Sequence, residues 1–199
     1  MKQKPVRYSI VIRPSKRIIN EVREMKNALR EAIGGLFNSV NSEAHITLFE
    51  FHAYEADFVP LLDEYKRVVE RLAPLDIKFD GFDHFPKNGA FYVKPTNLSA
   101  LAIIERCQDF KREISSKLLK DRAEGWTELF GKPHMSIGRK LLPEWISVAY
   151  SLFTEFKADF QCNIITIRKF NEERRQFDVI EELPMLGKGL VSDKQLNLF

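Results

Sequence analysis

The chain has 199 residues, of which 44% are hydrophobic and 30% charged, and its formal net charge is +3. This length allows one sizeable core, and the charge is compatible with an anionic substrate but too small for a protein that coats DNA. No apolar run is long enough for a membrane span, and the first residues lack a signal-peptide pattern. With two unpatterned cysteines, Cys107 and Cys162, expected as buried thiols, the chain is predicted to be cytoplasmic.

The first half of the chain alternates strand and helix patterns. Alternating apolar residues predict strands, and apolar stripes at 3/4 spacing predict helices. The expected order is a strand over 8–12, a helix over 18–32, a strand over 45–51, a helix over 58–72 and a strand over 75–79. Ser15 and Asp57 are the expected helix caps, and 81–89 is expected to be a bend or loop.

The second half repeats that order. A strand over 91–94 precedes a helix that begins after Asn97, its expected cap. Residues 117–131 are charged, contain Gly125, and are predicted to be a loop or a frayed helix end. A strand over 134–137, a helix from Pro143 and a hairpin of two strands over 160–169 and 176–183 complete the pattern.

The two rounds predict an α+β fold of two pseudo-symmetric lobes, each a small and mostly antiparallel sheet with helices packed outside. Together the lobes make one domain over 1–186, divided at roughly 1–85 and 86–186, with interleaving left open. Residues 187–199 are expected to form a flexible tail.

Two short segments share one pattern: a histidine, an apolar residue, a hydroxyl residue and an aliphatic residue. They are His45–Leu48 and His134–Ile137. Residues i and i+2 of a strand point to the same face, so each segment presents one imidazole and one hydroxyl together. The alternative is a pair of half-buried strand histidines bonded to their neighbours. A zinc site of His45, His52 and His134 has the wrong spacing and lacks a carboxylate pattern.

These paired segments resemble the motifs of the 2H phosphoesterase superfamily, which includes RNA 2',3'-cyclic phosphodiesterases often labelled 2'-5' RNA ligases. The resemblance covers residues 5 to 185. It implies that the two lobes face each other across a central cleft in which the histidines meet. It also implies that the protein is a hydrolase whose substrate is an RNA end or a small cyclic nucleotide.

The residue types fit this chemistry. Hydrolysis of a 2',3'-cyclic phosphate or a 2'-5' phosphodiester needs one proton removed from water and another delivered to the leaving oxygen. Two imidazoles with pKa values near 6.5 can do both at neutral pH. His45 and His134 are therefore the expected acid/base pair, and Thr47 and Ser136 the expected phosphate ligands. No metal or cofactor is required, and the direction in which the substrate lies decides which histidine is the acid.

Further substrate contacts are weaker predictions. Arg139 stands where some members of the superfamily carry an arginine, although strict alternation turns it away from His134, and a solvated strand-end arginine is the alternative. The equivalent position in the first segment is Glu50. Tyr92 and Phe130 are candidates for stacking on a base, against the alternative that such aromatics belong to the core. A non-catalytic RNA- or nucleotide-binding module is the rival to an enzyme.

The last five residues, 195–199, resemble the bacterial sliding-clamp-binding motif, glutamine-leucine-x-leucine-phenylalanine. Gln195, Leu196, Leu198 and Phe199 are therefore expected to bind a clamp, and an exposed apolar segment of this kind needs some partner to cover it. The alternatives are that the segment folds back on its own domain or seals a dimer contact.

Overall fold

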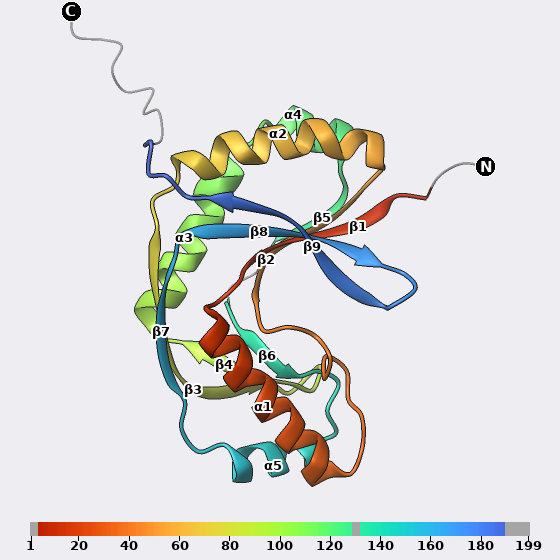
Figure 1. Ribbon diagram of the computed structural model, residues 1–199, viewed down its shortest axis with the longest axis vertical. Coiled ribbons are helices and arrows are strands. Elements are labelled where there is room, and N and C mark those ends of the chain that lie inside the picture. The colour runs from red at the N-terminus through yellow and green to blue at the C-terminus, as the bar shows by residue number, and fades with distance from the viewer. Residues whose placement is uncertain (1–3, 129–131, 190–199) are drawn as a thin grey trace, which may run out of the picture.

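The computed structural model describes residues 4–128 and 132–189. It describes the side chains of all these residues except 126–128. These residues form one nine-stranded sheet and five helices (Figure 1). The strands are β1 Val6–Ile12, β2 Ile46–Ala53, β3 Leu75–Phe85, β4 Ala90–Pro95, β5 Glu124–Glu128, β6 Met135–Gly138, β7 Lys157–Cys162, β8 Ile164–Asn171 and β9 Gln176–Pro184. The helices are α1 Lys16–Ile33, α2 Glu55–Arg71, α3 Asn97–Glu113, α4 Ser116–Arg122 and α5 Pro143–Leu152.

The sheet consists of two halves that meet at a single cross-strand pair. Its order is β7-β3-β4-β6-β2-β1-β8-β9, with β5 added to β2, and the pairs are antiparallel. β2 and β6 are joined only at Ile46 and Met135. We call β2, β1, β8 and β9 the His45 half, and β6, β4, β3 and β7 the His134 half. The α+β prediction with two similar antiparallel halves is confirmed.

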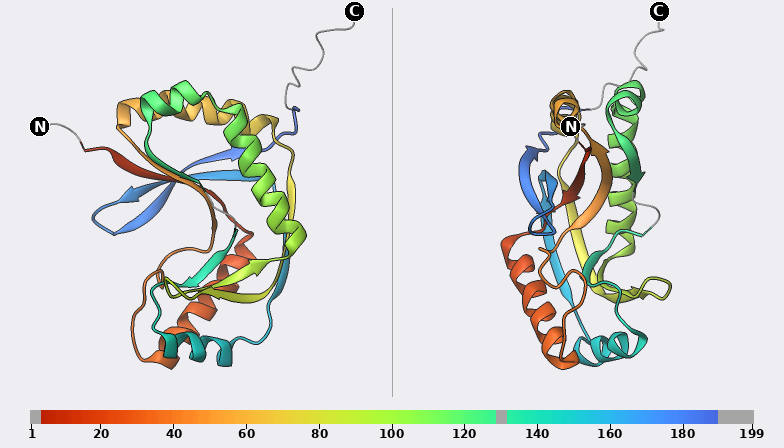
Figure 2. Two further views of the ribbon diagram at one scale, coloured as in Figure 1. Left: turned by 180° about the vertical axis from the view of Figure 1, so that it is seen from behind. Right: turned by 90° about the vertical axis from the view of Figure 1, so that its right-hand side faces the viewer.

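The two halves interleave in the chain. β8 and β9 come late in the sequence but pair with β1, whereas β3 comes before residue 86 and pairs with β4. The halves therefore do not coincide with residues 1–85 and 86–186. Figure 2 shows the same interleaving in space, since the blue strands β8 and β9 lie with the red strand β1. The connection runs through residues 160–169, which are not one strand as predicted: β7 ends at Cys162 and β8 starts at Ile164, in opposite halves.

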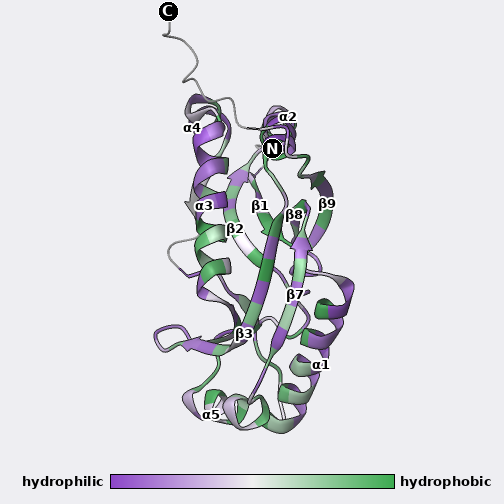
Figure 3. Ribbon diagram, turned by 90° about the vertical axis from the view of Figure 1, so that its left-hand side faces the viewer, coloured by the Kyte–Doolittle hydropathy of each residue, from purple (hydrophilic) through white to green (hydrophobic). Residues whose placement is uncertain are grey.

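Helices cover the sheet with the apolar stripes that the sequence predicts. α1 buries Ile18, Val22 and Leu29, and α3 buries Ile103, Cys107 and Phe110. In Figure 1, α1 and α5 lie together below the sheet, and α2 and α4 together above it. Figure 3 shows green, hydrophobic segments running along the strands, with purple segments concentrated on the helices. Within 4–128 and 132–189, no helix is long and apolar enough to cross a bilayer.

Two predicted loops are partly regular structure. Residues 116–128 form α4 and then β5, which pairs with β2. α4 buries no residue fully, and only Leu118 and Leu119 pack, partly buried, against the core, so its apolar pattern is too short to reveal it. The Ser115 cap and an ion pair between Arg122 and Asp57 also hold it. β3 continues to Phe85 because Gly81, at a φ of 74°, accommodates an irregularity in the strand without ending it.

Two helix caps also differ from the prediction. α2 begins at Glu55, so Asp57 lies in the first turn, where a carboxylate favours the helix dipole. Thr96, not Asn97, caps α3 by accepting a hydrogen bond from the Ser99 backbone N–H. The cap of α2 is Tyr54, three residues before Asp57, and that of α3 is one residue before Asn97; both shifts leave the buried face of the helix unchanged.

Candidate active site

The two motif segments lie on neighbouring strands at the junction of the halves. Because Ile46 and Met135 are antiparallel partners, Thr47 lies opposite His134 and His45 lies opposite Ser136. Opposed Cβ atoms in such a pair are about 5 Å apart. Ile46 and Met135 are fully buried, so the four motif side chains share the other face, where each is half-buried. The fold thus brings the two imidazoles and two hydroxyls together.

Both imidazoles are held by the same backbone contact. His45 Nδ1 lies 2.6 Å from the carbonyl oxygen of Glu43, and His134 Nδ1 lies 2.9 Å from that of Lys132. A carbonyl oxygen only accepts, so Nδ1 carries the hydrogen and donates it in both rings. Nε2 is then the free nitrogen of each neutral ring, and it can take up or release a proton. The identical spacing of two residues shows that the motif fixes the tautomer by itself.

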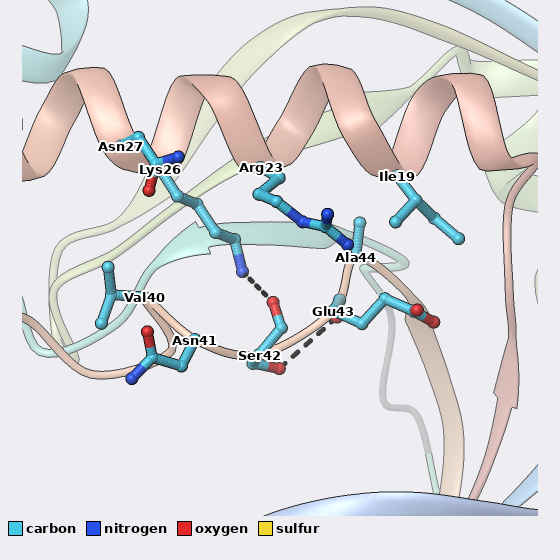
Figure 4. A pocket seen from close by; sticks show the side chains of 9 residues that line it. All are labelled: Ile19, Arg23, Lys26, Asn27, Val40, Asn41, Ser42, Glu43 and Ala44. Atoms are coloured by element: carbon cyan, nitrogen blue, oxygen red, sulfur yellow. Dashed lines mark hydrogen bonds between the residues drawn. The ribbon is translucent and has the colours of Figure 1, made fainter.

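A buried lysine holds the loop that presents the Glu43 carbonyl. Lys26 of α1 is 2% exposed, and its Nζ donates to the carbonyl oxygens of Ser39 and Ser42, at 2.8 and 2.7 Å. Figure 4 shows this side chain reaching from the helix to the loop. Burial lowers the pKa of Lys26 to about 7, with a further contribution from Arg139. Lys26 was not predicted from the sequence, although it occupies the buried face of α1 between Val22 and Leu29.

The surroundings lower the pKa of both histidines. For His45, burial and then the Arg168 guanidinium hold the pKa well below its usual value, despite the bond to Glu43. For His134, burial lowers the pKa, and Arg139 and Lys132 add to the effect. Both rings are therefore neutral at pH 7 in the free protein. Arg139 acts on both histidines, which places its charge near the junction of the halves.

A β-bulge in each motif strand turns a further charged residue into the site. Ile10 pairs with Phe49 but Val11 pairs with Thr47, so β2 carries one extra residue at Leu48. β6 carries one at Ile137, because Phe91 pairs with Gly138 and Tyr92 with Ser136. An extra residue reverses the alternation beyond it. The prediction that Arg139 faces away from His134 is therefore wrong.

The positions three residues after Thr47 and Ser136 are Glu50 and Arg139, and both bulges aim them at the cleft. One sequence signal marked the first bulge: in 46–51 the apolar positions shift phase between Leu48 and Phe49, which are both buried. In the second strand Gly138 has no side chain to reveal the shift. The two motif copies thus use the same backbone irregularity with opposite charges.

The His45 side of the motif face opens into a cavity of about 460 Å³, a volume in the range of small-molecule sites. His134 and Ser136 are not among the residues that line it. His45 and Thr47 line it together with Glu50 and Arg139. The β8–β9 hairpin supplies half of the remaining lining: Arg168, Phe170, Arg174, Arg175, Gln176, Phe177 and Val179. Sequence analysis named none of these hairpin residues, because nothing local distinguishes them from an ordinary surface hairpin.

Tyr92 and Phe130 are the two aromatic residues predicted to stack on a base. The Tyr92 ring is fully buried, 5.0 Å from the His134 ring and 4.7 Å from Phe85. Tyr92 therefore packs against the imidazole, with no free face for a base. Phe130 lies outside the described residues, as do Gln195, Leu196, Leu198 and Phe199.

The remaining histidines lie away from this group. His52 is exposed, and His84 Nδ1 lies 2.9 Å from the Tyr150 hydroxyl. In the described parts of the chain, no three His, Cys, Asp or Glu side chains are grouped as metal ligands. This includes the set of His45, His52 and His134 that the sequence analysis weighed.

Comparison with known proteins agrees with this geometry. A model of the 2'-5' RNA ligase superfamily matches residues 14–174. The chain is similar to the crystal structure of a protein of Thermus thermophilus, at a TM-score of 0.64 and 16% identity over 92% of this chain and 99% of that one. It is also similar to E. coli LigT complexed with NADP+, at a TM-score of 0.63 and 13% identity over the same shares. LigT complexed with 3'-AMP gives 0.60 and 12%, again over 92% and 99%.

Comparison with curated proteins gives no match. The structural likenesses, at these identities, establish a shared fold. The family model, which spans most of the chain, establishes more: this chain belongs to the 2'-5' RNA ligase superfamily of 2H phosphoesterases.

Proposed function

We propose that this protein hydrolyses 2',3'-cyclic phosphates or 2'-5' phosphodiesters, at RNA ends or in small nucleotides, with His45 and His134 as the acid/base pair. The observation that carries the proposal is the arrangement of the two imidazoles. They lie on one face of adjoining strands, and a backbone carbonyl holds the Nδ1 of each. Cys107 and Cys162 are both buried, which fits a role in the reducing cytoplasm.

In the proposed reaction, Nε2 of one histidine removes a proton from water while the water oxygen attacks phosphorus. The bond from phosphorus to one ribose oxygen breaks, and Nε2 of the other histidine protonates that oxygen. The Thr47 and Ser136 hydroxyls donate to the non-bridging oxygens, where negative charge increases, and Arg139 offsets that charge. The anionic substrate raises the pKa of both rings, which allows one of them to be protonated when substrate is bound.

The structures of similar fold support a phosphate-containing ligand. E. coli LigT has been solved complexed with phosphate, 3'-AMP, ATP and NADP+. Each of these ligands contains phosphate. By analogy, we assign the cleft between the two motif strands of the present chain to the reacting phosphate.

The test is hydrolysis of a nucleoside 2',3'-cyclic phosphate by the purified protein in the presence of EDTA. We expect a nucleoside monophosphate as product, and we expect His45→Ala and His134→Ala each to lower kcat by about 10²-fold or more, because each removes a proton-transfer group. His52→Ala is the matched control, since this exposed histidine of β2 lies outside the cleft lining. Turnover that survives loss of either motif histidine contradicts the proposal.

The rival function, a nucleotide-binding module without catalysis, gives a different result in the same assay. Such a module binds the cyclic phosphate, as isothermal titration calorimetry would show, and releases it unchanged. The two free Nε2 atoms favour the enzyme, because binding alone needs neither a fixed tautomer nor two proton-transfer groups.

We also propose that residues 195–199 bind a bacterial sliding clamp, on the strength of their motif alone. The test is recovery of purified clamp by the immobilised protein, compared with Leu198→Ala and Phe199→Ala variants. We expect both variants to lose the clamp, and equal recovery by all three forms contradicts the proposal.

A further inference from the structure

Arg168 is a buried cation for which the described residues provide no ion-pair partner. Its side chain lies in β8 and is 6% exposed. One NH2 group donates to the Ser9 hydroxyl at 3.2 Å, and the guanidinium lies 5.0 Å from the Phe177 ring centroid. Its Nε has no hydrogen-bond partner among the described residues, and no carboxylate described there comes within the 4.0 Å of an ion pair. An arginine buried in this way is costly unless an anion joins it.

The position of Arg168 points to the substrate as that anion. Ser9 pairs with Glu50 on one side and with Arg168 on the other, so the three residues form a row across β2, β1 and β8. Strands are about 4.8 Å apart, which puts Arg168 about 10 Å from the motif strand, on the same face. It lines the same cavity as His45 and Thr47. An anion at Arg168 is therefore distinct from a phosphate at the histidines but close enough to belong to the same ligand.

Two half-exposed aromatic rings lie beside this cation. Phe170 and Phe177 are cross-strand partners with ring centroids 5.2 Å apart. The Arg7 guanidinium lies 5.3 Å from the Phe177 centroid and 6.0 Å from that of Phe170. Exposed Arg175 lines the same end of the cavity. Glu50 and Glu43 attract Arg168 electrostatically without forming an ion pair with it. Rings and guanidinium planes next to a buried cation are the groups that recognise a base and the phosphate attached to it.

We propose that this hairpin surface, formed by Arg7, Arg168, Phe170, Arg175 and Phe177, binds the nucleotide that precedes the cyclic phosphate in an RNA strand. Arg168 and Arg175 contact its phosphodiester, and the two phenylalanines stack against a base. The inference rests on the proposed function and narrows it. It makes the preferred substrate the end of an RNA strand, and a free mononucleotide the poorer one.

The kinetic test compares kcat/KM for a trinucleotide that ends in a 2',3'-cyclic phosphate with kcat/KM for the corresponding mononucleoside cyclic phosphate. The ratio of the two values isolates the contribution of the preceding nucleotides, because the bond that breaks is the same. We expect a ratio of at least about tenfold in the native protein, since one charged hydrogen bond supplies that much. We expect Arg168→Gln and Phe177→Leu each to reduce the ratio severalfold.

Arg112→Gln is the control, because this exposed arginine of α3 pairs with Asp109 away from the cavity; its ratio should equal the native one. A native ratio near one, or a ratio that Arg168→Gln leaves unchanged in a variant with native-like thermal unfolding, overturns the inference.

A binding experiment separates this inference from the proposed function. Calorimetry with an unreactive trinucleotide that ends in a 3'-phosphate needs no turnover. Tighter binding of this trinucleotide than of a nucleoside 3'-phosphate, and loss of the difference in Arg168→Gln, support the hairpin surface whatever the hydrolysis assay shows. Equal affinity for the two ligands overturns the inference even in a protein that hydrolyses cyclic phosphates.

Discussion

The two halves of the sheet use the same backbone device in different electrostatic surroundings. In each, a motif strand carries a histidine bonded to the carbonyl two residues earlier and a bulge three residues after the histidine. Around His45 the charge with the largest effect on the pKa, after burial, is that of Arg168, which lacks an ion-pair partner among the described residues. Near His134 the charges are Arg139 and then Lys132, which pairs with Asp83 at 2.7 Å, and Tyr92 packs on the ring.

This difference shows how a repeated motif acquires two roles. The backbone sets the position and tautomer of each ring, and is the same in both halves. The surrounding side chains set the charge, and are different. The β8–β9 hairpin therefore places arginines beside His45, where Glu43 and Glu50 also lie, whereas His134 packs against Phe85 and Tyr92.

The largest expected effect concerns the motif hydroxyl that each half carries. Thr47→Val and Ser136→Ala each remove a hydroxyl donor to the non-bridging oxygens, and each should lower kcat by about 10²-fold. Single-turnover kinetics with a nucleoside cyclic phosphate measures the loss. Ser147→Ala, at an exposed serine of α5, is the control. If only one of the two motif variants loses activity, the halves are not equivalent in binding phosphate.

The next largest effect concerns the residue that each bulge turns inward, which is Glu50 in the His45 half and Arg139 in the His134 half. Arg139→Gln should lower kcat/KM about 10- to 100-fold, because a charged donor near the phosphate is lost. Glu50→Gln should have a much smaller effect, since the ion pair of Glu50 with Arg7 is half-exposed and contributes little. Steady-state kinetics of the two variants tests this. Similar losses of kcat/KM in the two variants would show that Glu50 and Arg139 contribute equally to the reaction.

The pH dependence of the reaction should reveal the cationic surroundings. The proposed mechanism needs one histidine neutral and the other protonated, and in the free protein the pKa of both is lowered. The maximum of kcat/KM should therefore lie below pH 6.5, which is the usual pKa of a histidine. The profile of kcat should lie at higher pH, because bound phosphate raises both values.

Arg168→Gln removes the charge that most lowers the pKa of His45 after burial. It should move the acid limb of the kcat/KM profile to higher pH, and Arg112→Gln should not. An unshifted limb in Arg168→Gln means that the two halves differ less in charge than the structure indicates.

The smallest expected effect on activity, and the clearest on stability, comes from Lys26. Its pKa is about 7 in the folded protein and near 10.5 when unfolded, so between these values the unfolded chain binds a proton that the folded protein does not. The free energy of unfolding should therefore rise with pH across this range, by at most about 1.4 kcal/mol per pH unit. Urea denaturation at pH 7 and 9 measures it.

Lys26→Met should lose this rise, and Lys16→Met, at an exposed lysine of the same helix, should keep it. A rise of native size in Lys26→Met assigns the pH dependence to other groups. In that case Lys26 contributes by its hydrogen bonds to the loop alone.

Local pattern in the sequence sufficed for four of the five helices, for most strands and for the shared face of each motif, because apolar spacing and the i, i+2 geometry of a strand act within a few residues. That spacing alone predicted that Thr47 and Ser136 lie beside the histidines. Tertiary structure decided the rest. Register across strands brings His45 to His134, two bulges turn Glu50 and Arg139 inward, and the crossing from β7 to β8 carries Arg168 to the site. Each depends on contacts between residues far apart in the chain, which no local pattern encodes.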